Sequence, residues 1–237
     1  MKHKFASPFF TNRRLSDVLP DGSWRGSAAV VVGGGPSFGD FDVRLLKGWR
    51  TIGTNLAFMR FDPTVILGAD LECLDWILSG DYEDRMPGCR DRFLASLALK
   101  AWYVKYPCSL PAGMLIVPLY RTLSASFRSF VFSSVEGLPH GDNVGYLGLQ
   151  LAVVLGANPI YLVGFDMRHR PVDEGTQTHW HPPHPSGPQP PEHLLRFLNR
   201  FQTVAPRIAA AGIRVVNLTS GSALDCFETA EAEEILC

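Results

Sequence analysis

The stretch that most constrains the fold is an apolar run that breaks into three glycines, a proline and a serine. Residues 28–32 read Ala-Ala-Val-Val-Val and are followed by Gly33, Gly34, Gly35, Pro36 and Ser37. Such a run predicts a buried strand, and the glycines predict a turn where the backbone closely approaches a ligand. Pro36 suits the start of a helix, which we expect over residues 40–47 with its N–H groups directed at the turn.

This turn predicts a nucleotide or phosphate site, although its spacing matches neither G-x-x-x-x-G-K-[ST] nor G-x-G-x-x-G. The alternative is a glycine turn that only lets strand and helix pack together. Composition narrows the setting, because 237 residues with 46% apolar side chains suffice for one α/β-sized core. We expect an N-terminal arm over residues 1–26 and a single nucleotide-binding domain over residues 27–237.

Charge and cysteine usage exclude several classes of protein. The net charge of −1 and the dispersed basic residues argue against a nucleic-acid partner. Five widely spaced cysteines without a C-x-x-C pair indicate a reducing, cytoplasmic setting and no metal site. The longest apolar stretch, residues 144–157, contains Gln150 and is too short to span a membrane. A homo-oligomer remains open.

Apolar runs alternate with helical patterns along the rest of the chain. Strands are predicted at residues 50–55, 63–70, 101–104, 114–117, 160–164 and 213–217. Helices are predicted at residues 71–78, 144–155, 192–211 and from 223 into the acidic tail, with a loop at 79–92. This alternation predicts an α/β, Rossmann-like fold: a mostly parallel sheet with helices on both faces.

Small or polar residues end several of these strands. Parallel strands place their carboxyl ends at one edge of the sheet, so Asn55, Asp70 and the Gly164–Asp166 turn should meet the glycine turn there. Asn55 can hydrogen-bond a base or ribose, and Asp70 a ribose hydroxyl or, through a divalent ion, a diphosphate. Both residues could instead be helix caps or turn residues. Asp166 is either satisfied by backbone amides or functional, and Arg168 could meet phosphate oxygens.

Residues 168–191 predict an irregular lid, because seven prolines lie between residues 171 and 191. Three histidines in this segment, His179, His181 and His184, are candidates for a general base that accepts a hydroxyl proton. Trp180 could pack on a sugar or a base. The histidines lack helical spacing and cysteine partners, which disfavours zinc, and solvated loop histidines are the alternative.

The turn from Gly33 to Ser37, followed by Asn55, resembles the G-x-G-P-S…N opening of bacterial family 42 sialyltransferases and related MAF/DUF115-type Rossmann-like proteins. Residues 160–166 resemble the I-Y-L-x-G-x-D strand of that group, and the likeness covers residues 28–75 and 142–225. It implies a GT-A-type fold that binds a cytidine nucleotide around Gly34, Asn55 and Asp70, with a lid histidine as base. Gly34 stands where the family has asparagine.

The resemblance also sets the expected function. It implies a nucleotide-dependent transferase, a glycosyltransferase with a CMP-activated sugar as donor and a small molecule or glycan as acceptor, needing no further cofactor. Arg168 stands where the family has a tyrosine that assists the phosphate leaving group. The group also includes 6-hydroxymethylpterin pyrophosphokinases, so diphosphate transfer from ATP with Mg²⁺ at Asp70 or Asp166 is the enzymatic alternative. A non-catalytic nucleotide-binding module, of a kind also encoded by phages, is the third.

Overall fold

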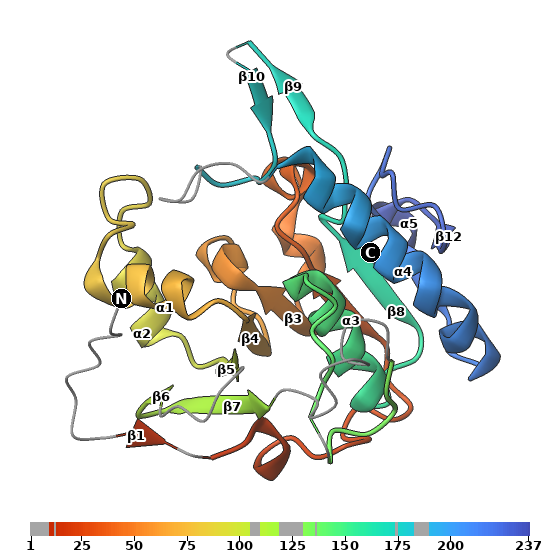
Figure 1. The fold of residues 1–237 in the computed structure, drawn as a ribbon, viewed down its shortest axis with the longest axis horizontal. Helices are drawn as coiled ribbons and strands as arrows, with labels where there is room; N and C mark the ends of the chain where they lie inside the picture. The colour runs from red at the N-terminus through yellow and green to blue at the C-terminus, as the bar shows by residue number, and fades with distance from the viewer. Residues whose placement is uncertain are drawn as a thin grey trace.

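An eight-stranded parallel sheet forms the centre of the computed structural model (Figure 1). The structure describes residues 10–11, 13–104, 110–118, 130–135, 137–173, 175–182 and 190–237. Across the sheet the strands are β12 (Glu228–Thr229), β11 (Val215–Asn217), β8 (Ile160–Val163), β2 (Ala29–Val32), β3 (Arg50–Thr54), β4 (Val65–Gly68), β5 (Leu99–Val104) and β7 (Met114–Pro118). Each neighbouring pair is parallel.

Both faces of this sheet are apolar because successive side chains of a strand point to opposite faces. Val31 of β2 belongs to one core cluster, and its neighbours Val30 and Val32 belong to another. The strands are therefore continuous runs of buried residues, which is typical of a parallel sheet covered on both sides.

Helices cover the two faces. α3 (Val144–Val154) and α4 (Pro191–Ala210) pack on the face that contains Val31. α1 (Leu71–Ser79), α2 (Cys89–Ala95) and α5 (Ala232–Leu236) cover the other face. Four short 3₁₀ helices complete the layers: η1 (Leu15–Asp17), η2 (Pro36–Gly39), η3 (Val43–Leu46) and η4 (Asn55–Met59). The predicted α/β, Rossmann-like fold class is confirmed.

Two small antiparallel ribbons lie outside the main sheet. β1 (Phe10–Thr11) pairs with β6 (Leu110–Pro111), and β9 (Arg170–Val172) pairs with β10 (Gly175–Gln177). The second ribbon projects from the body of the molecule above α4 (Figure 1). In the part of the chain that precedes β2, Leu15 and Trp24 are buried in the core.

Three expected elements outside the lid differ in the structure. The helix predicted over residues 40–47 is wrong: η2 already begins at Pro36, and Asp42 starts a separate turn by accepting a hydrogen bond from the Arg44 amide. The predicted loop at residues 79–92 contains the start of α2, because Cys89 and Phe93 are buried there. After residue 223 the chain runs through β12 and becomes helical only at Ala232.

The lid was expected to be irregular throughout, but its first part forms the β9–β10 ribbon. The proline-dense part, residues 183–189, lies outside the described residues. None of the helices in the described ranges is long and apolar enough to cross a membrane.

Candidate functional site

The strand order reverses between β2 and β8. β3, β4, β5 and β7 follow β2 on one side, and the chain then returns to place β8 on the other side of β2. The connections leaving β2 and β8 therefore diverge and open a crevice beyond their carboxyl ends, which is where open parallel sheets bind ligands. A cavity of about 430 Å³ lies at this point.

Most of the predicted site residues meet in this cavity. Its lining includes Gly33, Gly34, Gly35, Asn55, Asp70, Gly164, Asp166, Arg168, His179 and His181. Pro36 and Ser37 are not part of the lining, and His184 lies outside the described residues. Residues 130 positions apart in the chain thus surround one space, as the convergence of strand ends predicts.

The glycine turn is held against the end of β8. The Gly33 amide donates to the Val163 carbonyl oxygen at 2.7 Å, and the Gly35 amide donates to that of Gly164 at 2.9 Å. A Cβ atom on Gly33 would stand 2.6 Å from the Gly164 carbonyl oxygen. The two turns thus approach more closely than any side chain would allow.

Asp166 fastens this contact. It is 8% exposed, and its two carboxylate oxygens accept from the Ser37 amide at 3.0 Å and the Ser37 hydroxyl at 2.8 Å. A buried carboxylate needs such partners to offset its desolvation. The Ser37 amide therefore binds the protein's own carboxylate.

The lid segment is fixed to the same turn through Trp180. Its amide donates to the Gly34 carbonyl oxygen at 3.2 Å, and its ring packs edge-on against Phe38 at 5.6 Å. The Arg60 guanidinium lies 5.9 Å from the Trp180 ring centroid. Trp180 therefore anchors the segment that carries the two described lid histidines.

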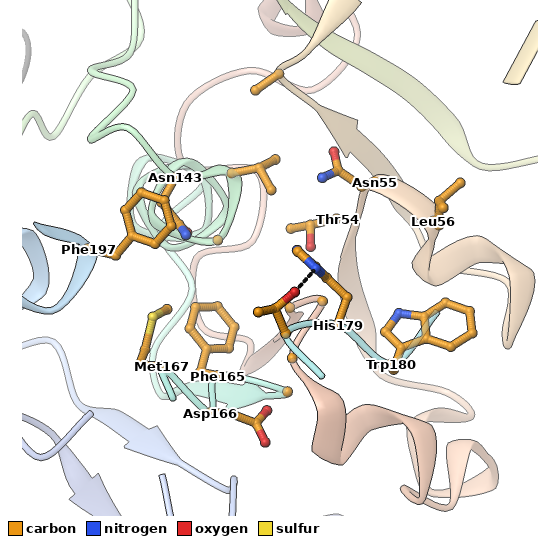
Figure 2. Close-up of a pocket in the computed structure, with 18 of the residues that line it drawn as sticks. Thr54, Asn55, Leu56, Asn143, Phe165, Asp166, Met167, His179, Trp180 and Phe197 are labelled. Carbon is orange, nitrogen blue, oxygen red and sulfur yellow. Dashed lines mark hydrogen bonds between the residues drawn. The ribbon is translucent and has the colours of Figure 1, made fainter. Parts of the chain in front are cut away.

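His179 and His181 stack on each other with ring centroids 5.0 Å apart. His179 Nδ1 lies 2.9 Å from the Thr178 hydroxyl, and Figure 2 shows this bond in the middle of the cavity, near Thr54 and Asn55. His181 is 5% exposed, and its Nδ1 donates to the Pro182 carbonyl oxygen at 2.8 Å. A carbonyl can only accept, so neutral His181 carries its proton on Nδ1.

Asn55 and Asp70 lie at the ends of β3 and β4, as predicted. The Asn55 Oδ1 atom is buried without a hydrogen-bond partner. Asp70 caps α1 by accepting from the Glu72 amide at 3.3 Å, so the helix-cap alternative holds while the residue also lines the cavity.

Arg168 also lines the cavity; it is exposed, and its guanidinium lies beside Gly221. Within the described ranges Arg168 has no ion-pair partner.

No three His, Cys, Asp or Glu side chains of the described residues are grouped so as to hold a metal ion. Magnesium at Asp166 would compete with the Ser37 hydrogen bonds.

The start of α3 is a wall of the cavity that the sequence analysis did not assign to the site. Asn143 caps the helix by accepting from the Tyr146 amide at 3.0 Å, and Asp142 pairs with Arg200 of α4 at 3.2 Å. Both residues line the cavity, as does Gly145. The Asp-Asn pair before an apolar run was a usable signal for this wall, because it marks a helix N-terminus.

Apolar residues complete the lining: Leu56, Ala69, Cys73, Trp76, Val144, Phe165, Met167, Trp180, Leu194 and Phe197. Apart from Phe165 in the predicted Gly164–Asp166 turn and Trp180 in the predicted lid, they carried no sequence signal, because only the fold brings them together. Figure 2 shows Met167 and Phe197 on one side of His179, and Leu56 and Trp180 on the other. The cavity thus has two apolar sides with the histidine between them.

Backbone strain is concentrated around this space. Asn55, Asp142 and Met167 have φ values of 48°, 61° and 50°, and they are the non-glycine residues of the described chain with positive φ. All three line the cavity. Conformations of this kind cost about 1–3 kcal/mol each and cluster at functional sites.

Comparisons with known proteins bear on the fold. No protein-family model matches the sequence, and no curated protein does. The structure is similar to the MAf glycosyltransferase from Magnetospirillum magneticum AMB-1, with a TM-score of 0.53 and 15% identity over 91% of this chain and 35% of that one. It is also similar to the sialyltransferase CstII from Campylobacter jejuni in complex with cytidine-5'-monophosphate, with a TM-score of 0.51 and 12% identity over 88% and 86% of the two chains.

This chain shares the fold of these glycosyltransferases. It spans about a third of the length of the MAf protein but most of the length of CstII. At such low identity the likeness extends to the fold alone.

Proposed function

We propose that the protein is a glycosyltransferase that takes its sugar from a CMP-linked donor and uses the cavity between β2 and β8 as its active site. The observation that carries the proposal is the lid histidine His179, placed over a cavity at the reversal of strand order. The fold adds support, since a sialyltransferase structure that holds CMP is built on it.

His179 is the residue we assign as general base. In the tautomer that donates from Nδ1 to Thr178, Nε2 is the proton acceptor. The acceptor hydroxyl gives its proton to Nε2, its oxygen bonds to the anomeric carbon, and the bond from that carbon to the phosphate oxygen breaks as CMP leaves. His181 is more deeply buried, and its Nδ1 is occupied by the carbonyl oxygen of the neighbouring Pro182, so we assign it a supporting role.

The leaving phosphate gains negative charge as this bond breaks. Arg168 lines the cavity and has no ion-pair partner in the described ranges, so its guanidinium is available to stabilise that charge. We assign the nucleoside to Asn55, Asp70 and Gly164 at the strand ends, and the support of the turn to Asp166.

Ligand binding tests the proposal first. We expect CMP to raise the melting temperature and ATP with Mg²⁺ to leave it unchanged, because only a ligand of the native state stabilises it. Stabilisation by ATP with Mg²⁺ and not by CMP would instead favour diphosphate transfer. Tight CMP binding without hydrolysis or transfer of any CMP-sugar would favour a non-catalytic module.

The base assignment is tested by replacing His179 with alanine. We expect kcat for donor hydrolysis to fall by about 10²–10⁴-fold, the usual contribution of a general base, with little change in melting temperature. His181→Ala is the matched control for a structural role: loss of its buried ring should lower the melting temperature, whereas the His179 variant should keep it. Full activity in the His179 variant would transfer the role to His181 or His184.

A further inference from the structure

Trp180 joins the lid to the body of the protein directly beside the proposed base (Figure 2). Its amide donates to the Gly34 carbonyl oxygen at 3.2 Å, and its ring packs edge-on against the buried ring of Phe38. The indole Nε1 atom is buried, and no described residue accepts a hydrogen bond from it. The ring is thus held by the groups that pack against it and not by its own polar atom.

One side chain from outside the lid contacts both of these rings. Arg60 follows η4 directly and is partly buried. Its guanidinium carbon lies 5.0 Å from the centroid of the Phe38 ring and 5.9 Å from that of the Trp180 ring. A guanidinium within about 6 Å of an aromatic centroid is attracted to the negative face of the ring. The charge of Arg60 therefore links a ring of the body to the ring of the lid.

Two hydrogen bonds fix the position of this guanidinium. Arg60 Nη1 donates to the Phe38 carbonyl oxygen, and Nη2 donates to the Phe41 carbonyl oxygen at 3.2 Å. Among the described residues Arg60 has no ion-pair partner, so its charge acts on carbonyl oxygens and rings. A planar fork reaches two acceptors at once, which a lysine ammonium on its flexible stem does less well. Arg60 is thus set firmly in the segment after the glycine turn.

We propose that Arg60 is a positioning residue, which holds Trp180 against the turn after β2 and thereby keeps the neighbouring His179 over the cavity. This inference rests on the proposed function for the role of His179, whereas the hold on the lid is a property of the unliganded protein. Arg60 is not among the residues that line the cavity, so it acts through Trp180 and not on a ligand.

Hydrogen exchange, followed by NMR on the isotope-labelled, unliganded full chain, tests the hold on the lid. The Trp180 amide is the reporter because its bond to Gly34 breaks when the lid lifts, and the buried amides of α3 report on global unfolding. In Arg60→Gln, which keeps a donor but loses the charge, we expect the Trp180 amide to exchange about tenfold or more faster, with α3 much less affected. Arg60→Lys keeps the charge without the fork and should lie between the two.

Arg92→Gln is the matched control. Arg92 also donates to a carbonyl oxygen of η4, that of Phe58 at 2.6 Å, but it pairs with Asp62 and not with a lid residue. We expect exchange of the Trp180 amide in this variant to stay within about twofold of the wild type. In donor hydrolysis, Arg60→Gln should lower kcat about tenfold or more with little change in KM, because the lining of the cavity is retained and only the base is displaced. Arg92→Gln should keep both constants.

Other results would overturn the inference. Unchanged exchange of the Trp180 amide in Arg60→Gln would do so while the proposed function stands. Equal acceleration in Arg60→Gln and Arg92→Gln, or equal acceleration of the Trp180 and α3 amides, would make the role of Arg60 merely structural. Faster exchange with unchanged kcat would show that the held lid does not position the base. If the wild type hydrolyses no CMP-sugar, the proposed function and the role of His179 fail, and the exchange data still decide whether Arg60 holds the lid.

Discussion

Asp166 is the residue through which two loops of the cavity are joined. Its hydrogen bonds from the Ser37 amide and hydroxyl tie the end of β8 to the turn after β2. Asp166→Ala leaves both donors without their charged partner, so we expect the free energy of unfolding to fall by about 2–3 kcal/mol in urea titrations. Ser37→Ala removes only the hydroxyl bond and should cost about 1 kcal/mol. Equal losses in the two variants would contradict this account.

The hydrogen bonds between Asp166 and Ser37 could not be predicted from the sequence, although the positions of single site residues could. Asn55, Asp70 and Asp166 could be placed in the site because each follows an apolar strand, and parallel strands end at one edge. The pairing of Asp166 with Ser37 joins residues 129 positions apart and depends on the turn conformations. Phe197 and Met167 reach the cavity only through packing, so no local pattern announces them.

Cys73 lines the cavity without being a nucleophile. It is 2% exposed, and burial raises the pKa of its thiol to about 12, so the thiol stays protonated at neutral pH. We expect iodoacetamide at pH 8 to label the exposed Cys237 well before Cys73, as peptide mass spectrometry would detect. Labelling of Cys73 at the rate of Cys237 would show that the cavity opens more widely than the structure indicates.

At the scale of elements, Phe201 joins α4 to the rest of the core. It is fully buried, and its ring meets those of Tyr146 at 5.6 Å and Phe165 at 5.9 Å. Phe201→Ala should lower the free energy of unfolding by about 3–5 kcal/mol through the cavity that it creates. Leu195→Ala is the matched control on the same helix, because Leu195 is 65% exposed and its loss should cost less than about 0.5 kcal/mol.

Asp21 fastens the segment that contains Ser133 and Ser134, and it makes this contact pH-dependent. Burial raises the pKa of Asp21, but hydrogen bonds from Ser134 and Ser133 outweigh it and leave the pKa below the ordinary value of 3.8. A carboxyl with a lowered folded-state pKa stabilises the fold above its unfolded pKa, and this stabilisation is lost as the pH falls through the folded pKa. The wild type should therefore be more stable than Asp21→Asn at pH 6, with the difference shrinking below about pH 4 in urea titrations. A difference independent of pH would exclude the carboxylate as its source.

Strands and helices could be predicted from the sequence where all of their residues are buried. β2, β4 and β8 follow from their Val, Ile and Leu runs, and α3 from its Asn143 cap and apolar sequence. The segment between β2 and β3 could not be predicted from its pattern, because an Asp42 cap divides it into two 3₁₀ turns. The strand β12 has two exposed residues and therefore no hydrophobic signal.

For the whole molecule, the alternation of apolar runs with helical patterns predicts the fold class, because parallel strands need helical connections. The order of the strands in the sheet could not be predicted in the same way. Nothing in a strand's own residues states that β8 lies beside β2, since both are buried on two faces and either could pair with another central strand. The reversal of order that creates the cavity is thus a property of the complete sheet.

Because β2 pairs with β8, the cavity forms late in folding. Synthesis delivers the glycine turn long before the loop that contains Asp166, since 129 positions separate Ser37 from its carboxylate partner. Contacts so distant in sequence form slowly, because closure of the intervening chain costs entropy before any contact repays it. During synthesis the glycine turn after β2 is therefore present before the Asp166 loop that forms the facing part of the cavity. The cavity is therefore complete only after β8 and the residues that follow it have been synthesised and paired with β2.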